Sequence, residues 1–152
     1  MREFKIRQAT AKDIDDLAEL EILCFSSPWS REAFAQDLAT NSLARYFIAE
    51  KEGRIIAYGG LWIILPEGHI TNIAVHPEHR QKGIGKALLR NMIEKSEIEG
   101  ITCHTLEVRV TNRNAIELYR SFGFVECGRR KNYYEDTNED ALIMWRESSR
   151  CK

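Results

Sequence analysis

The segment from residue 69 to residue 99 constrains the fold of this chain most strongly. An apolar run ends at Pro77, a basic loop with two glycines follows over Arg80–Lys86, and an amphipathic stretch continues to Glu99. The run before the proline is typical of a buried strand, whereas the spacing of apolar residues after the loop predicts a helix. The segment therefore predicts an α/β unit in which the loop lies at the N-terminus of a helix.

This loop has the composition of an anion-binding site. Gly83 and Gly85 allow a positive φ and a close approach of the main chain to a ligand. The first N–H groups of a helix lack intrahelical partners and lie at the positive end of the helix dipole, so anions bind well there. Arg80, Lys82 and Lys86 add positive charge. A tight basic turn without a ligand is the alternative interpretation.

Two familiar phosphate-binding loops do not match this sequence. A dinucleotide-binding G-x-G-x-x-G would need glycine at position 88, where the chain has Leu88. A Walker A loop would need glycine at position 80 and serine or threonine at position 87, where the chain has Arg80 and Ala87. The anion site, if present, is of another type.

The strand, loop and helix together resemble the GCN5-related N-acetyltransferases, the GNAT family. The family signature R/Q-x-x-G-x-G/A follows a V-x-P-x-x-R pattern, which Val75, Pro77 and Arg80 match here. The resemblance implies the GNAT acyl-CoA N-acyltransferase fold, an α/β fold whose mixed, mostly antiparallel central sheet is flanked by helices. It also implies acetyl-CoA as cosubstrate, bound through Ile73, Ala74, Val75, Arg80, Gln81, Lys82, Gly83, Ile84, Gly85 and Lys86.

Length and composition limit the other possibilities. With 152 residues, 43% of them hydrophobic, and a net charge of −1, the chain suffices for one domain with a core. We expect a single N-acetyltransferase domain over residues 1–147 and a short C-terminal tail over 148–152. No apolar stretch approaches the roughly 20 residues of a membrane span, and the charged N-terminus lacks a secretory signal, so we expect a cytoplasmic protein without membrane contact. The near-neutral charge does not favour nucleic acid as a partner.

The cysteines and histidines give no indication of a metal. The cysteines are scattered, which is typical of reduced thiols rather than disulfides or a zinc site: they are Cys24, Cys103, Cys127 and Cys151. His76 and His79 flank the end of the expected strand, and no further ligands accompany them. We therefore expect no metal.

The other predicted elements complete the order of an acetyltransferase fold. In sequence we expect a strand over 4–8, a helix from Thr10 to about Cys24, a second helix capped by Ser30, a hairpin of strands over 46–50 and 54–64, a strand over 69–77, a helix over 84–99, a strand over 103–110, a helix over 112–122, and a last strand pair over 124–129 and 141–145. In the family, the strand before the loop and the strand after its helix splay apart.

Glu107 is the candidate general base. In Leu106-Glu107-Val108-Arg109 apolar and charged residues alternate, so Glu107 and Arg109 share one strand face. On this pattern alone, the face could equally be a solvated one with an ion pair. The chain is also similar to the RimI branch of the family, the ribosomal-protein-alanine N-acetyltransferases, whose Leu-Glu-Val-Arg strand carries the base. That resemblance implies the same role for Glu107.

Tyr119 is the candidate general acid. It stands in Ala115-Ile116-Glu117-Leu118-Tyr119, which is similar to the RimI segment whose tyrosine protonates the CoA thiolate. The alternative is that Tyr119 only packs, because it belongs to an apolar stripe of the predicted helix. Asn112 is placed to cap this helix, and the resemblance implies that its side chain also contacts the cofactor.

Three further segments are similar to the RimI branch and bear on the acceptor: residues 25–30, 130–134 and 139–144. They imply that Trp29, Tyr133 and Tyr134 contact the substrate, which would be the N-terminal amine of a protein, an alanine of a ribosomal small-subunit protein. We expect a monomer or weak dimer. The acidic residues near 135–140 either favour a basic peptide or form a solvated loop. A lysine or small-molecule acetyltransferase, and a CoA-responsive binding module without catalysis, remain alternatives.

Overall fold

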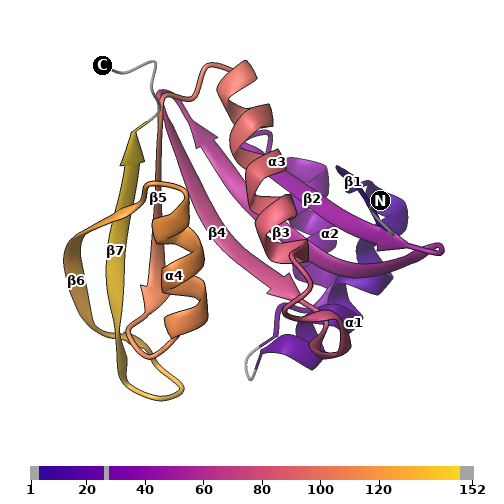
Figure 1. Ribbon diagram of the computed structural model, residues 1–152. Coiled ribbons are helices and arrows are strands. Elements are labelled where there is room, and N and C mark those ends of the chain that lie inside the picture. Colours follow the sequence, from indigo (N-terminus) through magenta and orange to yellow (C-terminus); the bar gives the residue numbers. More distant parts are fainter. Residues whose placement is uncertain (1–3, 26–27, 148–152) are drawn as a thin grey trace.

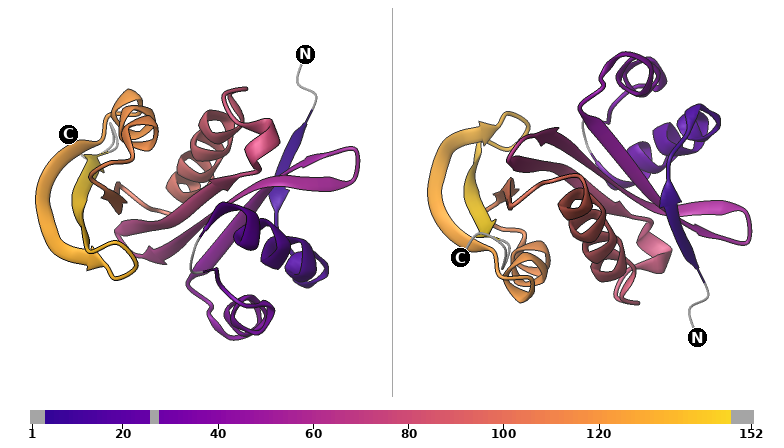
Figure 2. Two further views of the ribbon diagram at one scale, coloured as in Figure 1. Left: turned by 90° about the horizontal axis from the view of Figure 1, so that it is seen from below. Right: turned by 90° about the horizontal axis from the view of Figure 1, so that it is seen from above.

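The computed structural model describes residues 4–25 and 28–147, in which a sheet carries helices on both faces (Figures 1 and 2). The expected tail over 148–152, Cys151, and residues 26 and 27 of the RimI-like segment lie outside the described residues. The elements in order are β1 (Lys5–Gln8), η1 (Ala11–Asp13), α1 (Ile14–Cys24), α2 (Arg31–Thr40), β2 (Ala44–Lys51), β3 (Arg54–Ile64), β4 (Glu67–Val75), η2 (Pro77–His79), α3 (Ile84–Ile98), β5 (Cys103–Arg109), α4 (Arg113–Ser121), β6 (Val125–Tyr134) and β7 (Glu139–Glu147).

The sheet has the mixed, mostly antiparallel pairing that was expected. Over the described ranges it contains seven strands in the order β1-β2-β3-β4-β5-β7-β6. β4 and β5 are parallel, and every other neighbouring pair is antiparallel. The connection between the parallel pair is α3, the helix that the basic loop precedes.

Side-chain caps explain where several helices begin. The backbone N–H of Thr10 donates to Asp13 Oδ2 at 2.8 Å, and Ser30 Oγ accepts from the backbone N–H of Ala33 at 3.1 Å. Each bond satisfies an N–H group at the start of a helical segment. The expected starts at Thr10 and Ser30 are thus confirmed.

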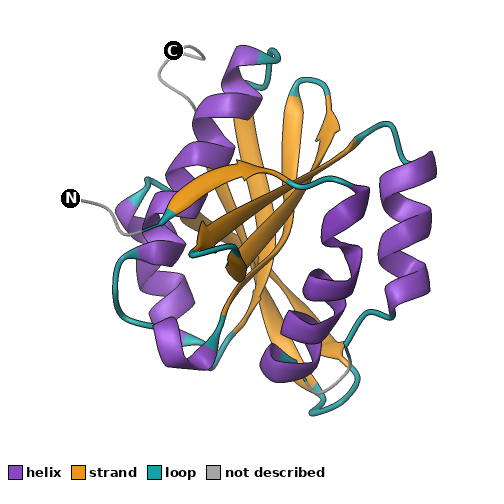
Figure 3. Ribbon diagram, turned by 90° about the vertical axis from the view of Figure 1, so that its right-hand side faces the viewer, coloured by secondary structure: helices purple, strands orange, loops and turns teal. Residues whose placement is uncertain are grey.

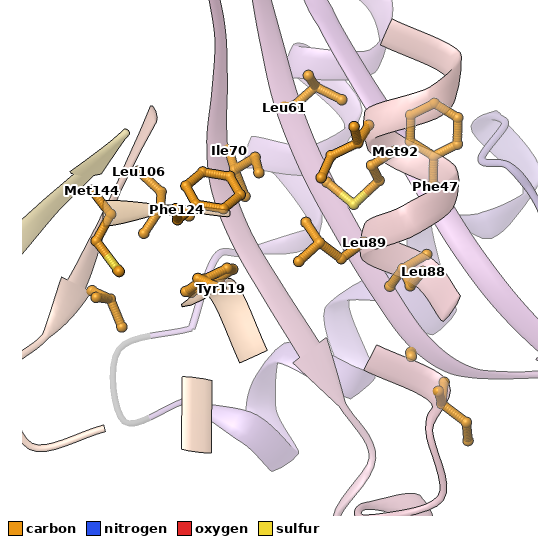
Figure 4. Close-up of a cluster of buried hydrophobic side chains, with 14 of the residues drawn as sticks. Phe47, Leu61, Ile70, Leu88, Leu89, Met92, Leu106, Tyr119, Phe124 and Met144 are labelled. Atoms are coloured by element: carbon orange, nitrogen blue, oxygen red, sulfur yellow. The ribbon is translucent and has the colours of Figure 1, made fainter. Parts of the chain in front are cut away.

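Helices lie on both faces of the sheet (Figure 3), and buried side chains fill the space between the sheet and each helix layer. α1 and α2 pack on one face, where Tyr46 and Ile48 of β2 point. α3 and α4 cover the other, where Phe47 and Ala49 point, and Figure 4 shows Leu88, Leu89 and Met92 of α3 beside Phe47 and Leu61. Because both faces are buried, the centre of β2, residues 46–49, is a continuous apolar run rather than an alternating one. Within the described ranges, no helix is long and apolar enough to cross a membrane.

β4 and β5 splay apart, as the resemblance implied. Their pairing ends at Ile70 and Leu106, and Figure 1 shows the two strands meeting at one end and diverging toward the other. The register of β4 against β3 shifts at the same place, leaving Thr71 as an extra residue. Such a bulge bends its strand. β4 therefore follows β3 away from β5, and the fork between β4 and β5 opens beyond Ile70.

The last two strands are longer than expected, so the boundaries predicted at 129 and 141 were wrong. A bulge between Arg130 and Tyr134 lets pairing resume at Tyr134 and Glu139. Asn132 adopts a φ of 52° in this bulge, and its backbone N–H donates to Asp140 Oδ1 at 3.0 Å. Asparagine tolerates this left-handed conformation better than most residues. The tyrosine pair consequently lies on β6, held by the sheet.

Candidate active site

A cleft of about 450 Å³ occupies the fork between β4 and β5. Its walls come from α1, β4, β5, α4, β6 and the two loops beside them. It brings together candidates that are far apart in the sequence: Trp29, Ile73, Glu107, Asn112, Tyr119, Tyr133 and Tyr134. The residues expected to act on the amine, the thioester and the acceptor therefore share one space.

Glu107 faces this cleft from β5. Its strand alternates as expected, with Leu106 and Val108 buried and Glu107 half-buried between them. The carboxylate Oε2 lies 3.5 Å from Nε of Arg130, a β6 residue that reaches across β7. The side chain of Glu107 is 26% exposed, so the carboxylate remains accessible from the cleft. The ion pair weighed in the sequence is thus present, together with an accessible carboxylate.

Arg109, on the same face, is fully engaged by the protein. Its guanidinium donates to Asp136 Oδ2 at 2.9 Å and lies 3.5 Å from Glu139 Oε1. The guanidinium carbon lies 4.0 Å from the ring centroid of Tyr134, a cation–π contact. Asp140 lies 3.7 Å from Arg129. These contacts place three of the acidic residues near 135–140 in ion pairs within the protein, while residues 135–138 remain exposed.

Tyr119 is buried, yet it lines the cleft. The ring packs edge-on against Phe124 with centroids 5.6 Å apart. The hydroxyl hydrogen-bonds to none of the residues that the structure describes, and burial raises the pKa of the phenol above its ordinary value. A neutral phenol with a free O–H can donate a proton, so packing and acid chemistry are compatible here. Asn112 caps α4, with Oδ1 accepting from Ala115 N–H at 3.2 Å.

The basic loop has the shape of an anion cradle at the start of α3. Gly83 is the N-cap with a φ of 79°, and none of the described side chains caps the helix there. A Cβ built on Gly83 would meet no atom of the described residues within 4 Å, so the space beside it is open. The first N–H groups of α3, which have no intrahelical partner, therefore begin beside this open space. Gln81 also has a positive φ, 61°.

Gly85 behaves differently from the expectation. It lies in the first turn of α3 and is absent from the positive-φ glycines, so the positive φ proposed for it was wrong. A Cβ at this position would lie 3.6 Å from Val75 Cγ2, ordinary contact between α3 and the end of β4. Packing of α3 on β4 therefore does not require glycine at position 85, and the backbone freedom is needed at Gly83 instead.

The edge of β4 facing the fork has main-chain groups without a strand partner. His76 N–H donates to Ile56 O at 2.8 Å, and in an antiparallel ladder every second residue points to the same neighbour. By that alternation Ala74 pairs with β3, whereas Ile73 and Val75 point toward the fork. The carbonyl of Val75 accepts from Arg80 Nε at 3.0 Å and from Cys24 Sγ at 3.4 Å. The main-chain N–H and carbonyl of Ile73 are therefore the best placed to bind a ligand that lies in the fork.

Glu21 is a cleft residue that the sequence analysis missed. It is 2% exposed, and its carboxylate accepts from the backbone N–H of Trp29 at 2.9 Å and from the hydroxyl of Tyr58. Asn72 Nδ2 in turn donates to the Tyr58 hydroxyl at 2.6 Å. The available signal was a carboxylate in the apolar stripe of α1, beside Leu17 and Leu20. The network holds the loop that carries Trp29 against the sheet.

The comparisons with known proteins agree with this geometry. A family model described as the acetyltransferase (GNAT) family matches residues 14–124. The chain is 42% identical to a Bacillus subtilis protein whose name assigns it provisionally as a ribosomal protein bS18-alanine N-acetyltransferase. The alignment spans 140 residues, which are 92% of this chain and 93% of the relative. It is 38% identical over 136 residues, covering 87% and 89%, to the Escherichia coli ribosomal protein bS18-alanine N-acetyltransferase. The crystal structure of the Escherichia coli ribosomal-protein-S18-alanine N-acetyltransferase superposes with a TM-score of 0.88 over 96% of this chain and 94% of that one, at 34% identity.

Proposed function

Because the chain belongs to the acetyltransferase (GNAT) family, we propose that it moves an acetyl group from acetyl-CoA to the α-amine of an N-terminal alanine, on a ribosomal small-subunit protein. The observation that carries this proposal is the cleft in which Glu107 and Tyr119 face one space at the β4–β5 fork. The names of the Bacillus subtilis and Escherichia coli relatives support the acceptor.

The loop and the fork fit acetyl-CoA. The open space beside Gly83 and the uncapped start of α3 suit a pyrophosphate, with Arg80, Gln81, Lys82, Ile84, Gly85 and Lys86 around it. The free main-chain groups of Ile73 suit the amides of the pantetheine arm, as the residue at the open edge of β4. Asn112, at the start of α4, would contact the same arm. No metal enters this proposal.

Glu107 and Tyr119 divide the proton transfers. Acetyl-CoA supplies a thioester whose acyl carbon bonds to the amine nitrogen as its carbon–sulfur bond breaks. Glu107 takes the proton that the nitrogen loses, directly or through one water, and Tyr119 donates its hydroxyl proton to the departing sulfur. An α-ammonium group has a reference pKa of about 7.7 to 8.0, against about 10.4 for lysine. Removing its proton near neutral pH therefore costs much less free energy than removing one from lysine. Proton exchange with bulk solvent then returns Glu107 to the carboxylate and Tyr119 to the neutral phenol.

The acceptor enters past the aromatic residues at the cleft mouth. Trp29 is 41% exposed and Tyr133 48% exposed, and both line the cleft with Tyr134. Their rings would enclose the first residues of a peptide. Because the proposed acceptor is a ribosomal protein, we propose that the enzyme acts in the cytoplasm, as a monomer or weak dimer.

An acceptor screen tests this function. Peptides that begin with a free alanine, peptides with a blocked N-terminus and free lysines, and polyamines are each supplied with acetyl-CoA, and CoA release is measured. The proposal expects alanine peptides to give the highest kcat/KM. Preference for blocked lysine peptides or polyamines would contradict the acceptor. CoA binding without release with any amine would identify a CoA-responsive binding module instead.

A further inference from the structure

Arg130 contacts Glu107, although its position on β6 gives no hint of a catalytic role. It lies opposite Ala141 of β7, which in turn lies opposite Arg109 of β5. Residues opposite one another across a sheet project to the same face, so Arg130 shares the face of Glu107 and Arg109. The side chain of Ala141 is small, so on this face β7 presents little obstacle between β6 and β5. The guanidinium can therefore cross β7, and Nε lies 3.5 Å from Glu107 Oε2.

The other cation near Glu107 is already neutralised. Arg109 is paired with Asp136 and Glu139. The charged and titratable groups around Glu107 are Arg130, Tyr133 and Tyr134 of β6, Arg109 of β5, Tyr119 of α4, Glu21 of α1, and Glu135 and Asp136 of the turn after β6. Within this described set, Arg130 is the cation that contacts the Glu107 carboxylate.

An acceptor amine meets conflicting requirements at Glu107. The carboxylate must lie close to take a proton, but its negative charge stabilises the ammonium, which has no lone pair for attack. A cation held beside the carboxylate offsets that effect, because the pair presents little net charge to the amine. Arg130 supplies such a cation while leaving Glu107 accessible from the cleft.

Arg130 also contacts the aromatic residues proposed to hold the acceptor. Its guanidinium carbon lies 5.9 Å from the ring centroid of Tyr133, and the rings of Tyr133 and Tyr134 are 5.1 Å apart, edge to face. Arg130 therefore contacts both Tyr133 and Glu107. A peptide that binds against Tyr133 would affect the position of the Glu107 carboxylate through Arg130.

We propose that Arg130 is a positioning residue of this acetyltransferase: it orients the Glu107 carboxylate toward the cleft and balances its charge so that the acceptor binds as the neutral amine. This inference rests on the proposed function, in which Glu107 is the base. Arg130 takes no proton and makes no bond to substrate.

Two substitutions of Arg130 and one matched control test the proposal. Arg130→Gln removes the charge, and Arg130→Lys keeps it. Arg129→Gln is the control, because Arg129 is the adjacent β6 residue, pairs with Asp140 and is similarly exposed, 54% against 56% of the side chain. Arg129 lies opposite Leu142 and so projects to the other face of the sheet. Since both arginines are exposed, all three variants should keep the thermal midpoint of the wild type.

The measurement is kcat as a function of pH at saturating acetyl-CoA and acceptor, with the Kd of CoA from calorimetry. For Arg130→Gln we expect kcat to fall several-fold and the midpoint of the acidic limb to move up by about half a unit to one unit. This is the size expected for a solvent-exposed charge roughly 6 Å from the amine, at an effective dielectric constant of about 40 to 80. Arg130→Lys should restore the midpoint, and the Kd of CoA should stay within about twofold in every variant.

The outcomes separate this inference from the proposed function. A wild-type midpoint and kcat in Arg130→Gln would overturn the role of Arg130, and so would an equal shift in Arg129→Gln, which would indicate a general surface-charge effect. The profiles are recorded with the best acceptor from the screen. A preference for lysine peptides would therefore overturn the alanine acceptor alone, and the comparison of variants would still decide the role of Arg130.

Discussion

Ile70 and Leu106 form the last pair between β4 and β5, and the next residue of β4, Thr71, is the bulged one. The site depends on this coincidence. One residue beyond the pair, β4 bends toward β3 and β5 continues along β7, so main-chain groups of β4 lose a strand partner. The amide groups of a pantetheine arm can hydrogen-bond to these main-chain groups. Glu107, directly after Leu106, is the first β5 residue within the open fork.

Glu107→Gln should lower kcat without weakening acetyl-CoA binding. The amide keeps the shape of the side chain but cannot take a proton, and general-base catalysis contributes about 10²- to 10⁴-fold. We expect a loss of at least about tenfold in kcat, a changed pH dependence, and a CoA Kd within about twofold of the wild type, since Glu107 lies away from the α3 loop. Steady-state kinetics and calorimetry measure these quantities. Unchanged kinetics would remove Glu107 from the mechanism.

Tyr119→Phe separates the role of the hydroxyl from the role of the ring in packing, because it removes only the hydroxyl. The ring contact with Phe124 is retained, and no described residue loses a hydrogen bond, so the thermal midpoint should change little. If the hydroxyl protonates the departing sulfur, kcat should fall by about ten- to a hundredfold. Turnover equal to the wild type in a folded variant would assign Tyr119 to packing only.

Gly83→Val should weaken CoA binding. A β-branched residue at a φ of 79° is strained by about 1 to 2 kcal/mol, and its side chain would fill the open space at the start of α3. Gly53→Val is the matched control, because Gly53 has a φ of 77° and open space around it but lies in the β2–β3 turn. Calorimetry should show a CoA Kd raised at least about tenfold in Gly83→Val and unchanged in Gly53→Val. Equal affinities in the two variants would contradict the cradle.

The stability of the fold should fall with acid because of His104. This side chain is fully buried on β5, where Nε2 lies 2.8 Å from Ser96 Oγ and Nδ1 has no partner among the residues that the structure describes. The Ser96 hydroxyl donates to Ile93 O, so the imidazole is the donor to Ser96 and is neutral. Burial, and secondarily the charge of Arg146, lower the pKa of His104 from 6.5 to about 4.

The sign of this effect follows from proton uptake. Between pH 6.5 and pH 4 the unfolded chain binds a proton at His104 that the folded chain does not, so the free energy of unfolding falls as pH falls through this window. The full loss is about 3 kcal/mol. Urea unfolding at a series of pH values should show a steeper decline for the wild type than for His104→Gln, whose amide can still donate to Ser96. Parallel curves would contradict the assignment.

The candidate site could be predicted only in part. The amphipathic stretch after the basic loop and the alternation around Glu107 are local patterns, and local patterns were sufficient to predict α3, β5 and the face that Glu107 shares with Arg109. The apolar stripe of α1 marks Glu21 as unusual but does not identify its partners, and no local pattern indicates the contact of Arg130. Their contacts join α1 to β3 and β6 to β5, and such contacts depend on which strands become neighbours.

The sequence by itself determined the order of elements, the basic glycine loop at the start of α3, and the family resemblance, because each depends on residues close together in the chain. Only the tertiary structure decided that the fork opens at Thr71, that Gly83 rather than Gly85 takes the positive φ, and that Arg130 lies at Glu107. The physical reason is that register, bulges and cross-strand ion pairs follow from how distant segments pack, and no pattern within one segment specifies its partner.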